Sequence, residues 1–82
     1  MIHKVKIVAV GDSCVTVTVN ETEENRLGVY DVIGERFEVV SAGDGVVRFF
    51  DPFYFQAVEY KVGDTFMFFN KAKKVESKQF SA

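Results

Sequence analysis

The side chains that most directly suggest chemistry are adjacent in the N-terminal part of the chain, at Ser13 and Cys14. A serine or cysteine acts as a nucleophile when a nearby base takes up its proton, and histidine is the usual base. The only histidine is His3, which either shares the alternating face of Val5 and Ile7 or frays at the terminus. The sequence therefore predicts no activated nucleophile, and we expect Cys14 to be a small buried apolar side chain.

The segment from Ile7 to Ser13 is an apolar strand that runs into Gly-Asp-Ser, and it resembles the first sequence block of the GDSL-type hydrolases. That resemblance implies a nucleophilic role for Ser13. Members of that family also need a helix after the serine, oxyanion donors from later Gly and Asn blocks, and a downstream Asp-x-x-His. Here a strand pattern follows Ser13, so we interpret Gly-Asp-Ser as a hairpin turn and predict no catalytic residue.

The sequence also lacks the patterns that hold metals or phosphates. Glu21, Glu23 and Glu24 form an acidic cluster, but their spacing differs from a calcium loop, which needs acids at alternating positions and a central glycine. A single cysteine excludes an intramolecular disulfide and a thiolate set for zinc. We therefore expect no metal, no cofactor and no enzymatic activity.

The composition is that of one folded domain. Of the 82 residues, 48% are hydrophobic and 27% are charged, and this length suits one domain rather than two. No apolar run approaches the roughly 20 residues that cross a bilayer, and the first residues lack the apolar core of a signal peptide. Since the single cysteine also fits a reducing compartment, we expect a cytoplasmic protein.

Alternation of apolar and polar residues predicts short β-strands along most of the chain. Residues 20–26 break this pattern and are expected to form a loop or a short helical turn. The expected strands are residues 4–10, 14–19, 34–40, 46–50, 53–60 and 65–72. We expect one domain over residues 1–72 and a frayed tail over residues 73–82.

About six short strands with closely spaced turns predict an all-β fold, a small antiparallel barrel of about five to six strands. Closure of a barrel would also cover edges that are rich in Val and Phe. Both SH3-like and OB-like barrels fit this length. We prefer the SH3-like form, because the sequence shows no confident helix of the kind that an OB-fold carries between its third and fourth strands.

Two segments share the order Tyr, Val, Gly, acid, Phe. They run from Tyr30 to Phe37 and from Tyr60 to Phe66, with one extra residue in the first. One interpretation is a tight Gly-acid turn used twice, each time to start a core strand whose Phe points inward. Chance similarity is the alternative.

Charge is distributed unevenly along the chain. Residues 20–38 carry six acidic and two basic side chains, whereas the part after residue 66 is rich in lysine. If the first and last strands are neighbours, one basic patch contains Lys4, Lys6, Lys71, Lys73 and Lys74. Single-stranded nucleic acid needs such cations beside exposed rings, which makes an OB-like nucleic-acid binder the alternative function. The net charge of −2 argues against it.

Aromatic side chains are concentrated in residues 49–55, where five of the seven residues are Phe or Tyr. Because a strand alternates its faces, these rings cannot all reach one core. If Phe50 and Phe55 face inward, Phe49 and Tyr54 face outward; the alternative is that both faces are covered and every ring is core. The predicted partner-binding residues are Phe49, Phe53, Tyr54 and Phe55. We expect a non-catalytic module for protein–protein interaction or self-association as a homo-oligomer.

Overall fold

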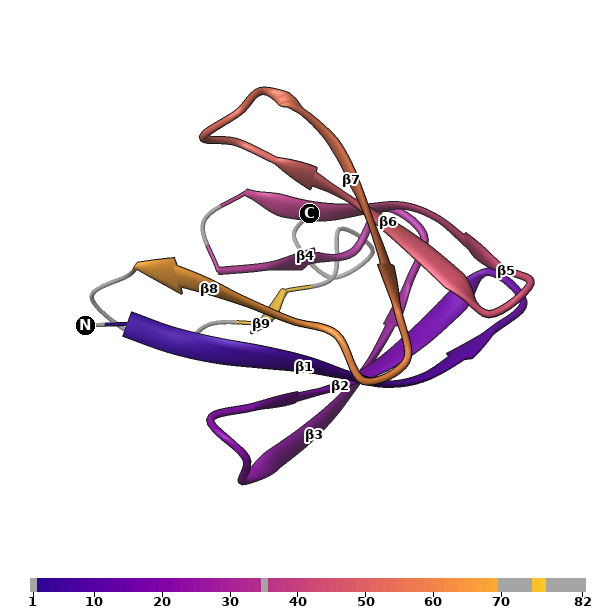
Figure 1. The fold of residues 1–82 in the computed structure, drawn as a ribbon, viewed down its shortest axis with the longest axis horizontal. Helices are drawn as coiled ribbons and strands as arrows, with labels where there is room; N and C mark the ends of the chain where they lie inside the picture. Colours follow the sequence, from indigo (N-terminus) through magenta and orange to yellow (C-terminus); the bar gives the residue numbers. More distant parts are fainter. Residues whose placement is uncertain (1, 35, 70–74, 77–82) are drawn as a thin grey trace.

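The computed structural model describes residues 2–34 and 36–69 and the backbone of residues 75–76. These residues form β-strands joined by turns, with no helix among them (Figure 1). The strands are β1 (Ile2–Gly11), β2 (Cys14–Val19), β3 (Glu23–Gly28), β4 (Val32–Ile33), β5 (Phe37–Gly43), β6 (Val46–Asp51), β7 (Gln56–Lys61), β8 (Thr65–Phe69) and β9 (Val75–Glu76). The predicted all-β fold is confirmed.

The strands form two antiparallel sheets. One sheet has the order β3-β2-β1-β8, and the other has the order β7-β6-β5-β4-β9. In β2, Val15, Val17 and Val19 are fully buried, whereas Thr16 and Thr18 between them are only partly buried. This alternating burial is what the sequence pattern predicted for a strand with one face on the core.

The core between the sheets contains more valine than phenylalanine. Of the described rings, only Phe37, Phe49 and Phe68 are buried phenylalanines, and Phe66 packs against them while partly exposed. Phe37 of β5 stacks on Phe66 of β8 with their ring centroids 5.0 Å apart, so this pair joins the two sheets. The other buried apolar residues are Val5, Ile7, Val15, Val17, Val19, Leu27, Ile33, Val39 and Val47.

The expected closed barrel is not found among the described residues, which form two sheets. The physical reason is the direction of the two hairpins that end the sheets. The β2–β3 and β6–β7 hairpins extend to opposite sides of the molecule, so the outer edges of β3 and β7 do not meet (Figure 1).

Two segments differ from the expected strand positions. Residues 23–26, expected in a loop or a helical turn, belong to β3, which pairs with β2 along its whole length. Pairing to an adjacent strand outweighs the weak strand preference of Glu-Glu-Asn-Arg, because strand preference depends strongly on context. In the tail that is expected to fray, residues 75–76 form β9 and pair with β4. The other residues of that tail lie outside the described part of the chain.

The chain contains an internal repeat in which strands β1 to β4 correspond to strands β5 to β8. We call residues 2–33 the first unit and residues 37–69 the second unit. Each unit is a meander of three antiparallel strands followed by a fourth strand. The first hairpins of the two units carry a bulge at the same place, with Val8 and Val40 as the extra residues. Gly11 and Gly43 end the first strand of their units in the same register.

The turn before the fourth strand is also the same in both units. In the first unit, the Asp31 carboxylate accepts a hydrogen bond from the Gly28 amide at 2.7 Å. In the second unit, the Asp64 carboxylate accepts one from the Lys61 amide at 2.8 Å. An aspartate that bonds to nearby backbone in this way stabilises a tight turn. The repeat is therefore built from matching hydrogen bonds and not only from a similar order of strands.

The fourth strand of each unit belongs to the sheet of the other unit. Strand β4 pairs with β5, and β8 pairs with β1. At the start of these pairings, the Val39 amide donates to the Asp31 carbonyl oxygen and the Ile7 amide donates to the Asp64 carbonyl oxygen, both at 2.9 Å. Because neither sheet is complete without a strand from the other unit, the two units form a single interlocked structure.

The similar segments from Tyr30 to Phe37 and from Tyr60 to Phe66 lie within this repeat, but the sequence aligned them at the wrong residues. In the structure Gly63 corresponds to Tyr30 and not to Gly34. The amides of Tyr30 and Gly63 make equivalent bonds to the first strand of the other unit, both at 2.8 Å, and both residues have positive φ, at 77° and 95°. The repeated acids are therefore Asp31 and Asp64, since their carboxylates close the matching turns.

We expect Gly34→Ala to destabilise the fold more than Gly45→Ala does. Both glycines have positive φ, at 69° and 77°, so each substitution adds backbone strain of about 1–2 kcal/mol. A Cβ at Gly34 would also lie 2.7 Å from a ring carbon of Phe68, whereas one at Gly45 would meet nothing within 4 Å. Overlap with a buried ring adds about 1–3 kcal/mol. Urea unfolding measures both variants, and equal losses of stability would contradict the packing of Phe68 on Gly34.

Candidate functional site

The residues considered for nucleophilic chemistry lie at the turn between β1 and β2. Ser13 has a φ of 58°, and its amide donates to the carbonyl oxygen of Ala42 at 3.0 Å. Gly-Asp-Ser is thus a hairpin turn, as the sequence predicted. His3 lies near the opposite end of β1, roughly 30 Å away along an extended strand. This arrangement places no imidazole beside the Ser13 hydroxyl.

His3 faces the core, which is the first of the two positions expected for it. Its side chain is buried and packs on Phe68, with the ring centroids 5.1 Å apart. The side-chain amide of Asn20 lies 2.9 Å from His3 Nδ1, which accepts its hydrogen bond. The histidine therefore joins β1 to β8 and to the turn after β2, and its position is explained by packing.

The most exposed aromatic side chains lie on the turn between β6 and β7. Phe53, Tyr54 and Phe55 are 67%, 75% and 81% exposed, and we call these three residues the aromatic turn. Figure 1 shows this turn at the outer end of the β6–β7 hairpin. Three adjacent rings therefore face solvent, and the strand that follows begins at Gln56 rather than at Phe53 as expected.

The buried carboxylate of Asp51 orders the aromatic turn. One of its oxygens accepts hydrogen bonds from the amides of Phe53 at 2.8 Å and Tyr54 at 3.3 Å. The carbonyl oxygen of Asp51 accepts a third bond, from the amide of Phe55 at 2.7 Å. Asp followed by Pro, at residues 51–52, is a sequence typical of a turn, but it does not by itself indicate that the carboxylate is buried. The Asp-Pro signal could have identified this role, because Asp at the first position of a turn bonds to backbone amides further along it.

The expected outward position of Phe49 is wrong. Its side chain is fully buried, with its ring centroid 6.1 Å from that of Tyr60 and 5.2 Å from that of Phe66. Val47 and Phe49 face the core, while Phe50 on the other face is only partly buried. Successive side chains of a strand point to opposite faces. The expectation that Phe50 faces inward therefore placed every residue of this strand on the wrong face.

Two of the five predicted lysines lie on β1. This strand pairs with β8, so the first strand is the neighbour of the strand that precedes the C-terminal lysines, as the basic patch requires. Lys6 is exposed, and the Lys4 ammonium lies 3.8 Å from the Glu21 carboxylate. The aromatic turn joins strands of the other sheet. The remaining predicted lysines, Lys71, Lys73 and Lys74, lie outside the described residues.

Tyr60 lies near the end of β7, partly buried against the core. Its ring centroid is 4.9 Å from that of Phe66. Burial raises the pKa of the Tyr60 phenol above its ordinary value of 10.0, and the negative charges of Asp51 and Asp64 raise the pKa further. The uncharged phenol is therefore the form that the fold stabilises.

No family model, curated protein or solved structure matches this chain. The part of the chain that the structure describes contains no helix long and apolar enough to cross a membrane. It also contains no group of three or more His, Cys, Asp or Glu side chains placed to hold a metal ion. The candidate site is therefore defined by geometry alone, as three exposed rings on a turn ordered by a buried carboxylate.

We expect the protein to lose stability in alkali more steeply than its Tyr60→Phe variant. A pKa raised by folding contributes stability that is complete below the unfolded value of about 10 and is lost as the pH rises through the folded value. The free energy of unfolding, measured in urea from about pH 9 to 12, should therefore fall less in Tyr60→Phe. The exposed Tyr30 provides the control variant, Tyr30→Phe. Parallel pH profiles for the wild type and Tyr60→Phe would contradict the inferred environment of Tyr60.

Proposed function

We propose that this protein is a non-catalytic binding module that engages a protein partner, or a second copy of itself, through the aromatic turn. The supporting observation is the exposure of three adjacent rings on a turn that Asp51 holds by three hydrogen bonds. Contiguous exposed apolar side chains mark interaction surfaces, and aromatic residues are enriched in the buried centres of interfaces. A turn already ordered in the free protein loses less conformational entropy on binding.

The conformation of Phe55 supports the same proposal. Its φ of 59° is uncommon for a bulky residue, yet its ring is more exposed than that of any other large apolar residue described. The ring meets Phe50 edge-on with the centroids 5.4 Å apart, so it has one aromatic contact although most of it is exposed. Backbone strain that gains little burial within the fold is typical of functional positions. Contact with a partner would supply the missing burial.

The proposal also includes the type of β-fold and the cellular location. We favour the SH3-like interpretation over the OB-like one, because the described residues contain no helix between any two strands. A cytoplasmic location is supported by the single, partly buried cysteine, since a reducing compartment keeps thiols free.

We expect a double variant, Tyr54→Ser with Phe55→Asn, to lose binding to a protein partner. Removal of an aromatic anchor from an interface costs about 2 kcal/mol or more, which is roughly thirtyfold in affinity. The partner would be recovered from an extract of the cells that make the protein, then purified and titrated against each variant by calorimetry. The matched control is Tyr30→Asn, since Tyr30 is also exposed and also has positive φ, at 77°.

The double variant should retain its free energy of unfolding, because Asn tolerates positive φ better than Phe does. A partner that binds the double variant and the control with equal affinity would contradict the proposal. Recovery of no partner, together with a strictly monomeric protein, would contradict it as well.

Pairing of β1 with β8 favours nucleic-acid binding as a second candidate, because β8, the strand that precedes the C-terminal lysines in the sequence, lies beside Lys4 and Lys6. This candidate predicts retention on a single-stranded DNA column at low salt, with elution as salt rises. Reversal of Lys71, Lys73 and Lys74 to Glu should abolish retention. A wild-type protein that flows through the column at low salt would exclude this candidate.

A further inference from the structure

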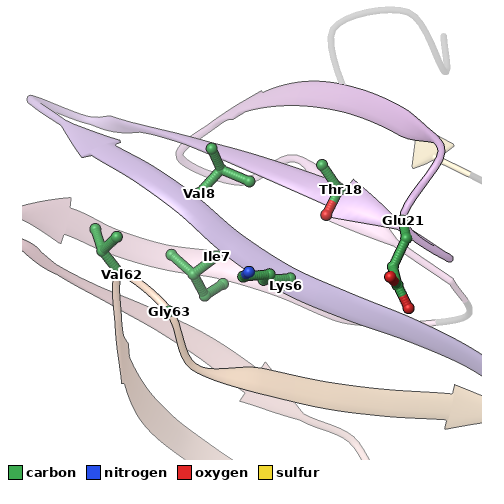
Figure 2. A pocket seen from close by; sticks show the side chains of 7 residues that line it. All are labelled: Lys6, Ile7, Val8, Thr18, Glu21, Val62 and Gly63. Atoms are coloured by element: carbon green, nitrogen blue, oxygen red, sulfur yellow. The ribbon is translucent and has the colours of Figure 1, made fainter.

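A surface hollow lies between β1 and the turn that joins β7 to β8 (Figure 2). Its volume is about 470 Å³. The side chains come from β1, from β2 and the turn after it, and from the β7–β8 turn, as Figure 2 shows. The lining residues are Lys6, Ile7, Val8, Thr18, Glu21, Val62 and Gly63.

The internal repeat shows what occupies the corresponding place in the other unit. Gly63 corresponds to Tyr30, since the two amides make equivalent hydrogen bonds. Thr18 corresponds to Phe50, because Thr18 pairs with Lys6 as Phe50 pairs with the equivalent residue of β5. A glycine and a threonine thus hold two positions of the hollow's lining, where the corresponding positions of the other unit carry aromatic residues. The hollow therefore lies where the repeat itself has larger, aromatic residues.

The chemistry of the lining also suits an aromatic side chain, and a tyrosine in particular. Val8 and Val62 are exposed apolar side chains that a ring can cover. The Lys6 ammonium is a cation of the kind that is attracted to the face of a ring. The Glu21 carboxylate can accept a hydrogen bond from a phenol hydroxyl. The hollow therefore combines apolar side chains with a cation, Lys6, for the face of a tyrosine ring and a carboxylate, Glu21, for its hydroxyl.

We propose that this hollow receives the aromatic turn of a second copy of the chain, with Tyr54 inserted. This proposal rests on the proposed function and names its partner. A molecule cannot fill its own hollow in this way, because the six residues of β7 separate the aromatic turn from the β7–β8 turn by about 20 Å. One chain therefore carries both the exposed aromatic turn and the hollow proposed to receive it.

The contact is heterologous, since each copy donates its turn to one neighbour and receives a turn from another. Such contacts produce closed rings or open chains of molecules rather than symmetric pairs. Repulsion between copies is weak, because the net charge is only −2. The wild type should therefore show a mean mass that rises with concentration beyond that of a dimer.

The decisive variant is Gly63→Tyr, which places in the β7–β8 turn, beside β1, the residue that the other unit carries at the equivalent position. The substitution adds backbone strain, because Gly63 has a φ of 95°, but Tyr30 carries a tyrosine at the equivalent position with a φ of 77°, and a Cβ at Gly63 would meet nothing within 4 Å. We expect self-association to weaken at least thirtyfold, as measured by sedimentation velocity. Gly45→Tyr is the matched control, since Gly45 also has positive φ and open space but lies away from the hollow.

A mixing experiment tests the two halves of the contact together. Gly63→Tyr retains the aromatic turn and lacks the hollow, whereas Tyr54→Ser retains the hollow and lacks the ring. Each variant alone should be a monomer, and the mixture should form a one-to-one heterodimer that grows no further. Thr18→Phe, which copies Phe50, is a second way to fill the hollow if Gly63→Tyr does not fold.

Each contrary result has a distinct meaning. A wild type that stays monomeric at millimolar concentration overturns this inference, while the proposed function stands if the aromatic turn binds another protein. Self-association that Tyr54→Ser abolishes and that neither Gly63→Tyr nor Thr18→Phe weakens also overturns it, because the turn then docks elsewhere. A mixture of the two variants that remains monomeric overturns it as well.

Discussion

The structure depends on the exchange of fourth strands between its two units. Strand β8 completes the sheet of the first unit by pairing with β1, and β4 joins the sheet of the second unit by pairing with β5. The β1–β8 ladder pairs residues 2–6 with residues 65–69, so it forms only when both meanders are in place, whereas β4 and β5 are neighbours in the sequence. The ring of Phe37, on β5, stacks on the ring of Phe66, on β8, so packing also joins the two sheets. Neither unit can bury its apolar face without the other.

Matching backbones with different side chains give the two sides of the molecule different surfaces. The hairpin tip of the first unit carries the exposed acid Glu21, and the tip of the second carries the aromatic turn. Tyr30 precedes β4, whereas Gly63 holds the equivalent position before β8. The hollow lies beside Gly63. In the proposed function, the loops on these unlike surfaces would already be positioned before a partner binds.

Most of the strands follow from local sequence. Alternation in residues 4–10 and 14–19 predicted the strands of the first hairpin, and Gly-Asp-Ser at residues 11–13 predicted the turn between them. Local pattern did not predict β3, because its polar residues form a strand only when β2 offers a pairing edge. At the candidate site, the sequence identified the aromatic segment but placed Phe49 on the wrong face. Phe49 and Phe50 are adjacent and identical, so alternation alone does not show which of them faces the core.

The sequence by itself determined the all-β class, the turns and the concentration of rings between residues 49 and 55, because strand periodicity and turn chemistry act over a few neighbouring residues. The tertiary structure alone decided which strands pair across the two units and which rings face solvent. It also decided that Tyr30 and Gly63 hold equivalent positions. These outcomes depend on hydrogen bonds and packing between residues that are distant in the chain, and such contacts leave no local pattern in the order of the amino acids.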